Sequence, residues 1–209
     1  MNSAAGNKIN NVKVYGMEES IIASGYPMSI EPCEDMDNHE LTEGDKKRSK
    51  VLGNAKAGSG HDCYLKGIIV QFDLTYSQVA WQQLQRYHFI DFISSMSKMH
   101  RIHKVDLKKQ CNQYVDDRVI NVVNEYLEAY KNAADKKEAK ELWLKAVYNI
   151  PCGLELTARL TTNYLQLKTM YLQRRHHKLP EWQEFCDWCL TLPHFAEMTG
   201  VEKQGGKKQ

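Results

Sequence analysis

The chain has 209 residues, of which 42% are apolar and 26% charged, and its net charge is +2. This composition is typical of a globular domain. The near-neutral charge argues against a general polyanion-binding surface, so we expect no nucleic acid polymer as a partner. No apolar run approaches the roughly 20 residues that span a bilayer. The N-terminus shows no apolar signal segment, so we expect a cytoplasmic protein without membrane contact, whose six cysteines are thiols.

Polar composition at both ends predicts mobile tails over residues 1–10 and 199–209, around a single domain over 11–198. The segment VKVYG at 12–16 predicts a short strand. Residues 33–50 contain few apolar side chains and predict an exposed helix and loop.

A half-buried strand is predicted over 64–74, because four apolar side chains alternate there: Ile68, Val70, Phe72 and Leu74. Thr75 or Ser77 can cap an amphipathic helix that follows. We expect this helix to end in the serine-rich turn around 94–97.

The rest of the chain shows helical periodicity. Apolar spacing predicts helices over about 115–130, 136–147, 154–174 and 180–192, the last with Pro180 in its first turn. Strands that precede helices favour an α+β domain, with an antiparallel sheet and a mostly helical C-terminal half.

Two polar clusters around the first predicted helix suggest ligand binding. Gln83 and Arg86 share one predicted helix face with Tyr87, and a glutamine beside an arginine can contact an amide edge while the guanidinium holds an anion. The alternative is a solvated face. Next, Ser94–Ser97 at the helix end could bind a phosphate that Lys98 and Arg101 neutralise. The alternative here is a serine-rich turn without a ligand.

A third cluster lies on the helix predicted over 154–174. Asn163, Gln166 and Gln173 fall near one face, which can line a pocket or form the solvent side of an amphipathic helix.

Other motifs are weak. Cys186 and Cys189 form a CxxC pair, and a zinc site would need two more ligands, which could come from His176, His177 or His194. The two cysteines lie in an apolar helical pattern, however, so we expect buried thiols and no metal. His176 and His177 are expected to be exposed.

Nucleophilic catalysis by Ser95 beside Tyr87 and His88 is not favoured, since spacing places no orienting carboxylate there, although Asp91 is near. The sequence contains no P-loop, dinucleotide-binding fingerprint, HExxH or GxSxG motif. Residue types alone thus indicate an α+β protein with an anionic-ligand site.

Two segments resemble the flavin-dependent thymidylate synthases, the ThyX family. That family has Gly-His-Glu, a strand, and a helix with Gln-x-x-Arg-His-Arg followed by a serine-rich motif. This chain has Gly60-His61-Asp62 and then Gln83-x-x-Arg86-Tyr87-His88. Further on, the family has a proline break, Thr-x-x-Asn, an arginine and a Trp-Glu segment. The matching residues here are Pro151, Thr161-Thr162-Asn163, Arg174, Trp182 and Glu184.

The resemblance implies methylation of dUMP at C5 to give dTMP. Methylenetetrahydrofolate and NADPH would be co-substrates, FAD would relay hydride, and a homotetramer would assemble each site from several subunits. Catalytic roles would fall to Arg86, His88 and Lys168. Nucleotide-binding residues would be Gln83, Arg86, Ser95, Ser97, Lys98, Arg101 and Gln166. Cofactor-binding residues would be His61, Arg86, Tyr87, His88, Asn163 and Arg174.

Several positions depart from the family pattern. The Arg-His-Arg triplet is Arg86-Tyr87-His88, the family's second histidine falls on Gly67, and its glutamate falls on Ser94. The nucleotide-contacting arginine falls on Leu165, with Lys168 the nearest cation on that face. These departures motivate two alternatives: folate-dependent hydroxymethylation of a pyrimidine nucleotide, or a nucleotide-binding homologue without catalysis.

Overall fold

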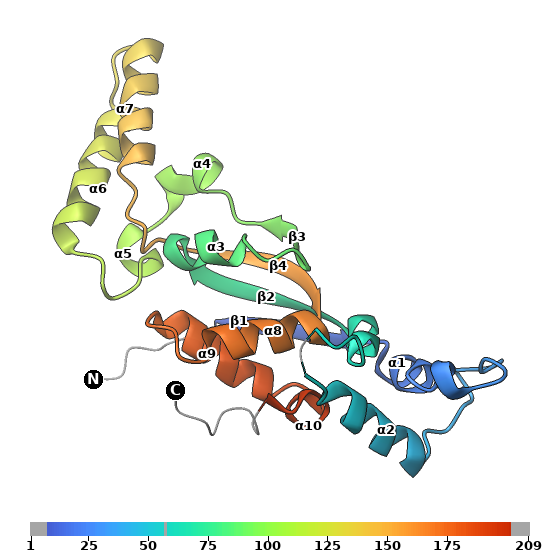
Figure 1. Cartoon of the computed structure of the whole chain (residues 1–209). Coiled ribbons are helices and arrows are strands. Elements are labelled where there is room, and N and C mark those ends of the chain that lie inside the picture. The colour runs from blue at the N-terminus through green and yellow to red at the C-terminus, as the bar shows by residue number, and fades with distance from the viewer. Residues whose placement is uncertain (1–7, 57, 202–209) are drawn as a thin grey trace. The chain divides into compact units, whose positions relative to one another are not determined.

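The computed structural model describes residues 8–56 and 58–201. They form an α+β fold with an antiparallel four-stranded sheet in the order β1-β2-β4-β3 (Figure 1). The predicted fold class is therefore confirmed. The strands are β1 (Ile9–Tyr15), β2 (Ile69–Ser77), β3 (Ile90–Ser95) and β4 (Glu155–Asn163).

Helices account for most of the remaining elements. The α-helices are α1 (Met17–Ala23), α2 (Glu43–Gly53), α3 (Gln78–Leu84), α4 (Lys98–Arg101), α5 (Leu107–Gln110), α6 (Asp117–Lys131), α7 (Lys136–Tyr148), α8 (Tyr164–Arg174), α9 (Pro180–Leu190) and α10 (Phe195–Thr199). Short 3₁₀ helices are η1 (Tyr26–Met28), η2 (Cys63–Gly67) and η3 (Ile102–Lys104).

The chain divides into two compact units. Among the described residues, unit 1 contains Lys8, Leu74–Tyr87 and Ile93–Arg159. Unit 2 contains the described residues of Ile9–Asp73, His88–Phe92 and 160–201. Strands β2, β3 and β4 each pass from one unit into the other.

Unit 1 is built around a helical hairpin, in which α6 packs on α7 (Figure 1). Asp116 and Asp135 cap these two helices, since each side chain accepts hydrogen bonds from backbone N–H groups of the first turn. The apolar stripe of α6 enters a core with neighbouring segments. That core contains Ile102, Leu107, Ile120, Val123, Leu127, Ala146, Ile150 and Leu154.

Unit 2 packs its C-terminal helices on the buried face of β2. The Phe72 ring lies 4.6 Å from the Trp188 ring and 6.3 Å from the Phe185 ring, measured between centroids. Helix α10 packs on α2. A Cβ on Gly53 would lie only 2.1 Å from the carbonyl oxygen of Met198, so this close approach requires glycine.

Strand β2 follows the predicted alternation. Ile68, Val70, Phe72 and Leu74 are all buried, and Ser77 caps α3 by accepting a hydrogen bond from the Ala80 N–H. The strand begins later than expected, because residues 64–67 belong to the 3₁₀ helix η2.

The first predicted helix is wrong in its second half. Helix α3 ends at Leu84, and strand β3 replaces the expected helix end and serine-rich turn. Ile90 is buried while the rest of β3 is exposed. Ile90, Phe92 and Ile93 are β-branched or aromatic residues that favour an extended edge strand once β4 offers its backbone for pairing.

The helix predicted over 154–174 is also wrong in its first half. Residues 155–163 form β4, and α8 begins only at Tyr164. Ala158, Leu160 and Thr162 are buried at alternate positions, which is the strand period. The strand expected at 12–16 is confirmed as part of β1, and the helices expected over 115–130, 136–147 and 180–192 are confirmed as α6, α7 and α9.

The ranges predicted as tails include residues of regular, buried elements. Ile9 and Asn10 belong to β1, and Thr199 and Val201 are buried in unit 2. The remaining tail residues, 1–7 and 202–209, lie outside the described residues. The exposed helix expected within 33–50 is α2. Among the described helices none is long and apolar enough to cross a membrane.

Candidate functional site

A cavity of about 230 Å³ in unit 1 gathers the cations of the predicted phosphate cluster. Its wall contains Ser97, Lys98 and Arg101, together with Lys104 and Gln110. No carboxylate is among the lining residues. We call this the basic cavity. Three cations around an opening without a counter-charge favour an anionic ligand.

The surrounding chain holds the wall of the basic cavity in place. Ser97 caps α4 by accepting a hydrogen bond from the His100 N–H. The Lys98 Nζ donates to Gln78 Oε1 at 2.8 Å, which orients its ammonium without neutralising it. The Gln110 Nε2 donates to the Glu155 carbonyl oxygen at 2.6 Å.

Other predicted residues of unit 1 lie outside the lining of the basic cavity. Gln83 is half-buried in the last turn of α3, and Arg86 is exposed in the turn that follows it. Tyr87 is half-buried beyond that turn. Ser95 is exposed at the end of β3. The shared helix face predicted for Gln83, Arg86 and Tyr87 is therefore wrong, because the helix ends before Arg86.

The first turn of α8 in unit 2 contains a buried donor without a partner. Asn163 caps the helix, and its Oδ1 accepts a hydrogen bond from the Gln166 N–H at 2.9 Å. Gln166 is only 8% exposed, and its Nε2 has no hydrogen-bond partner among the described residues. An unsatisfied buried amide costs about 1–3 kcal/mol, so a ligand acceptor at this position would stabilise the site.

Lys168 makes a fully buried ion pair in unit 2. Its side chain is 1% exposed, and its Nζ lies 2.7 Å from Asp62 Oδ2. The same Nζ donates to the carbonyl oxygens of Gly53 at 2.8 Å and Ala55 at 3.1 Å. All three donors of the ammonium are thus engaged by the chain. This pair joins α8 to the turn that contains His61.

The other predicted residues of unit 2 lie near these elements. His61 is exposed in the turn before η2, next to the buried Asp62. His88 is exposed before β3, where Thr162 Oγ1 donates to the Phe89 carbonyl oxygen at 2.6 Å.

Arg174 lies at the end of α8 against an aromatic ring. Its guanidinium carbon is 4.7 Å from the centroid of Trp182, a cation–π contact that fixes the side chain. His177 packs edge-on to the same ring at 6.3 Å, and burial lowers its pKa with Arg174 adding to the effect.

The CxxC pair lies in the core of unit 2. Cys186 and Cys189 are buried, and burial raises the pKa of the Cys186 thiol to about 12 and that of Cys189 well above its usual value. Such thiols are unreactive. Within the described part of the chain no cluster of three histidine, cysteine or acidic side chains could hold a metal ion.

Sequence reasoning missed Lys104, Gln110 and Asp62. The signal for Lys104 was the run of basic residues from Lys98 to Lys109, and Asp62 directly follows the predicted His61. Gln110 carried no signal, since only the fold brings α5 to the basic cavity.

Comparisons with known proteins identify similar folds. No family model and no curated protein sequence matches this chain. Two crystal structures of the flavin-dependent thymidylate synthase ThyX from Helicobacter pylori, both with FAD and dUMP, match with TM-scores of 0.66 and 0.65 and identities of 17% and 16%. These matches cover 92% and 91% of this chain and 97% and 96% of the ThyX chains.

A third similar structure is the UMP/dUMP methylase PolB from Streptomyces cacaoi bound with 5-Br dUMP. It matches with a TM-score of 0.57 and 15% identity, over 93% of this chain and 94% of that one. At these identities the comparisons establish the fold. The chain therefore has the fold of the ThyX thymidylate synthases in a divergent form.

Proposed function

We propose that this chain modifies carbon 5 of a pyrimidine deoxynucleotide, and that the reaction is methylation of dUMP to dTMP. The observation that carries the proposal is the convergence of Ser97, Lys98 and Arg101 in the basic cavity of unit 1. The sequence resemblance assigns the same three residues to the nucleotide. The fold supports it, since structures with this fold contain dUMP or 5-Br dUMP.

The basic cavity would hold the phosphate. A phosphomonoester carries up to two negative charges, and charge-assisted hydrogen bonds from lysine and arginine are about twice as strong as neutral ones. Arg101 can bind two phosphate oxygens in a fork, Lys98 and Lys104 add point charges, and Ser97 adds a hydroxyl donor. Ser95 stays a proposed contact from the neighbouring strand.

Two glutamines would contact the base. Uracil presents carbonyl acceptors and an N–H donor, which match the two donors and one acceptor oxygen of an amide. Gln166 supports this assignment directly, because its buried Nε2 has no acceptor among the described residues. Gln83 is the second proposed contact.

The residues of α8 fit a ligand such as FAD, which carries carbonyl and phosphate acceptors. The guanidinium of Arg174, held over the Trp182 ring, is a donor of the required kind. When bound, FAD would supply the redox chemistry by relaying hydride from NADPH, while methylenetetrahydrofolate would supply the one-carbon unit. The proposed cofactor-binding residues are His61, Arg86, Tyr87, His88, Asn163 and Arg174.

Arg86 and His88 remain the proposed catalytic residues, because both are exposed and therefore accessible to substrate. For Lys168 we propose a positioning role in place of direct catalysis, since its three donors are engaged within unit 2. It would hold the turn of His61 against α8.

A homotetramer is part of the proposal. Strand β3 is an edge of the sheet, and large apolar side chains there and next to it are exposed. Edge strands with exposed apolar residues favour association with another chain. The exposed residues are Phe89, Phe92, Ile93, Met96 and Met99.

The alternative reactions follow from the altered triplet Arg86-Tyr87-His88. Hydroxymethylation of a pyrimidine nucleotide would keep the basic cavity and dispense with the flavin. A homologue without catalysis would bind dUMP and form no product.

The test combines cofactor retention, nucleotide binding and product analysis. The protein would be mixed with FAD, desalted and examined by visible absorbance, and dUMP affinity would be measured by calorimetry. We expect retained flavin bands, and Arg101→Ala should weaken dUMP binding about tenfold or more because a charge-assisted contact is lost. Lys109→Ala, an exposed cation on α5 outside the cavity lining, is the control and should leave the affinity unchanged.

Product analysis with methylenetetrahydrofolate and NADPH then separates the reactions. A colourless protein that binds dUMP and forms a hydroxymethyl product would replace our reaction with the first alternative. If Arg101→Ala and Lys109→Ala weaken dUMP binding equally, the basic cavity is not the phosphate site.

A further inference from the structure

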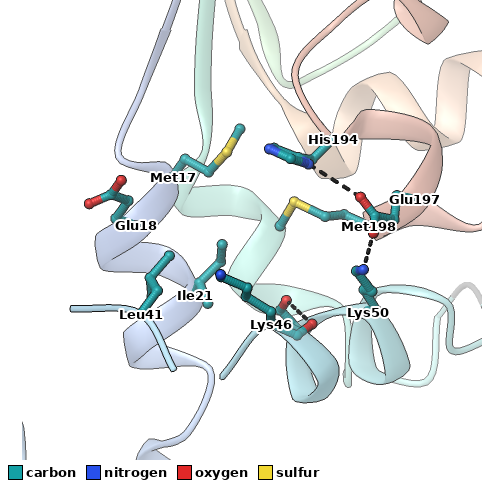
Figure 2. A pocket seen from close by; sticks show the side chains of 10 residues that line it. Met17, Glu18, Ile21, Leu41, Lys46, Lys50, His194, Glu197 and Met198 are labelled. Carbon is teal, nitrogen blue, oxygen red and sulfur yellow. Dashed lines mark hydrogen bonds and ion pairs between the residues drawn. The ribbon is translucent and has the colours of Figure 1, made fainter. Parts of the chain in front are cut away.

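A second cavity lies within unit 2, and none of the residues assigned to the nucleotide or cofactor lines it. Its volume is about 280 Å³, and its walls come from α1, α2, the loop before α2, and the C-terminal segment that contains α10 (Figure 2). We call it the helical cavity. It is distinct from the basic cavity, which lies in unit 1.

One part of the helical cavity is apolar. Met17 and Ile21 from α1, Leu41 from the loop and Met198 from α10 line it, and Ile21 and Met198 are themselves buried in the core. Methionine is unbranched and polarisable, so two methionines can adapt to an apolar or aromatic group of varied shape. Pockets for small molecules are typically apolar with a few placed polar groups.

A lysine supplies the placed polar group. Figure 2 shows the Lys46 ammonium directed into the cavity, whereas the Glu18 carboxylate points away from it. Lys46 Nζ lies 2.8 Å from Glu43 Oε1, but the Glu43 side chain is 90% exposed. Exposed pairs of this kind contribute little stability, so a ligand anion can replace Glu43 at low cost.

Two other basic side chains of the helical cavity share one carboxylate of its wall. Lys50 forms an ion pair with Glu197, and His194 Nδ1 lies 3.2 Å from Glu197 Oε2 (Figure 2). One carboxylate thus accepts from two side chains of the wall. Lys46 differs from them in that its partner, Glu43, is not among the lining residues.

The backbone at His194 is strained. Its φ of 55° lies in the left-handed region, which residues other than glycine rarely adopt. Such strain is concentrated at binding and catalytic sites, where the surrounding structure holds it. Here it places the His194 ring at the rim of the cavity (Figure 2).

We propose that the helical cavity binds a small amphipathic anion, an apolar chain or aromatic body with one carboxylate or sulfonate group. The body packs against Met17, Ile21, Leu41 and Met198, and the anionic group pairs with Lys46. This site is independent of the proposed nucleotide chemistry.

The experiment uses the full chain and 1-anilinonaphthalene-8-sulfonate, an aromatic fluorophore with a single sulfonate. We expect saturable fluorescence enhancement with one site per chain. Octanoate should displace the dye, and octanamide, its uncharged analogue, should need about tenfold higher concentration because it lacks the ion pair. dUMP should not displace it.

Variants locate the site. Lys46→Ala should weaken dye binding about tenfold, and Met17→Glu, which adds a carboxylate at the wall, should weaken it as much or more. Lys47→Ala removes an exposed cation of the same helix outside the lining and should change nothing. Thermal melts would confirm that each variant folds.

Any of four results would overturn the proposal. These are equal weakening by Lys46→Ala and Lys47→Ala, unchanged binding in both Lys46→Ala and Met17→Glu, equal displacement by octanoate and octanamide, or displacement by dUMP. The last would place the dye at the nucleotide site, which the binding data for Arg101→Ala would test separately.

Discussion

Replacing Lys168 with methionine removes the cation from the buried ion pair of unit 2. The side chains of Lys168 and Asp62 are 1% and 4% exposed, so the remaining Asp62 carboxylate would have little access to water. The carbonyl oxygens of Gly53 and Ala55 would also lose a donor. Removing one partner of a buried pair costs about 3–5 kcal/mol, because the other charge is left uncompensated.

The assay is urea denaturation with a thermal melt at neutral pH. For a chain of this length, each kcal/mol lowers Tm by roughly 2–4 °C, so Lys168→Met should lower it by about 6–20 °C. The exposed Lys178, which lies beyond α8, provides a matched control, and Lys178→Met should stay within about 0.5 kcal/mol of the wild type. The double variant Asp62→Asn with Lys168→Met should lose less than the sum of the single variants.

Unchanged stability together with a loss of dUMP binding in Lys168→Met would refute this reasoning. If Lys168→Met unfolds at the wild-type urea concentration yet no longer binds dUMP, the lysine acts directly on the nucleotide. That result would restore the catalytic role that the sequence pattern assigned to it, and our positioning role would be wrong.

Two further variants test α8 and α2. Gln166→Leu should raise the free energy of unfolding by about 1–3 kcal/mol, because it removes a buried amide without a partner. The same variant should weaken the binding of dUMP or FAD. Higher stability with unchanged binding of both ligands would argue against Gln166 as a ligand contact. The hydrogen bond from Thr42, with the Arg48 guanidinium beside it, lowers the pKa of Asp45 from 3.8 to about 2. Because the folded pKa is depressed, the contribution of Asp45 is present above about pH 4 and is lost as pH falls through about 2. Asp45→Asn should therefore cost about 1–2 kcal/mol at pH 7 and much less near pH 2 in urea denaturation, and an equal loss at both pH values would contradict the assignment.

Strands β3 and β4 show where local pattern reasoning failed. Leu156, Leu160 and Tyr164 recur at a spacing of four, which fits a helix, while Ala158, Leu160 and Thr162 alternate, which fits a strand. The choice depends on pairing with β2, a strand about eighty residues earlier in the chain. Long-range pairing of this kind has no local signature.

The candidate site was predictable only in part, because it too depends on contacts between residues far apart in the chain. Residue type and spacing selected Ser97, Lys98 and Arg101, which the structure brings into one cavity. The resemblance to the ThyX family implied a catalytic role for Lys168, because the sequence could not show that Asp62, 106 residues earlier, engages it.

The sequence by itself determined the elements whose signal is local. The alternation in β2, the apolar stripe of α6 and the proline at the start of α9 each specify one segment through its own side chains. Which polar groups lie in contact with one another is determined only by the tertiary structure. Contacts between distant segments form only when the core has packed. These contacts create the basic cavity and the Asp62–Lys168 pair, and they leave the amide of Gln166 buried without a partner among the described residues.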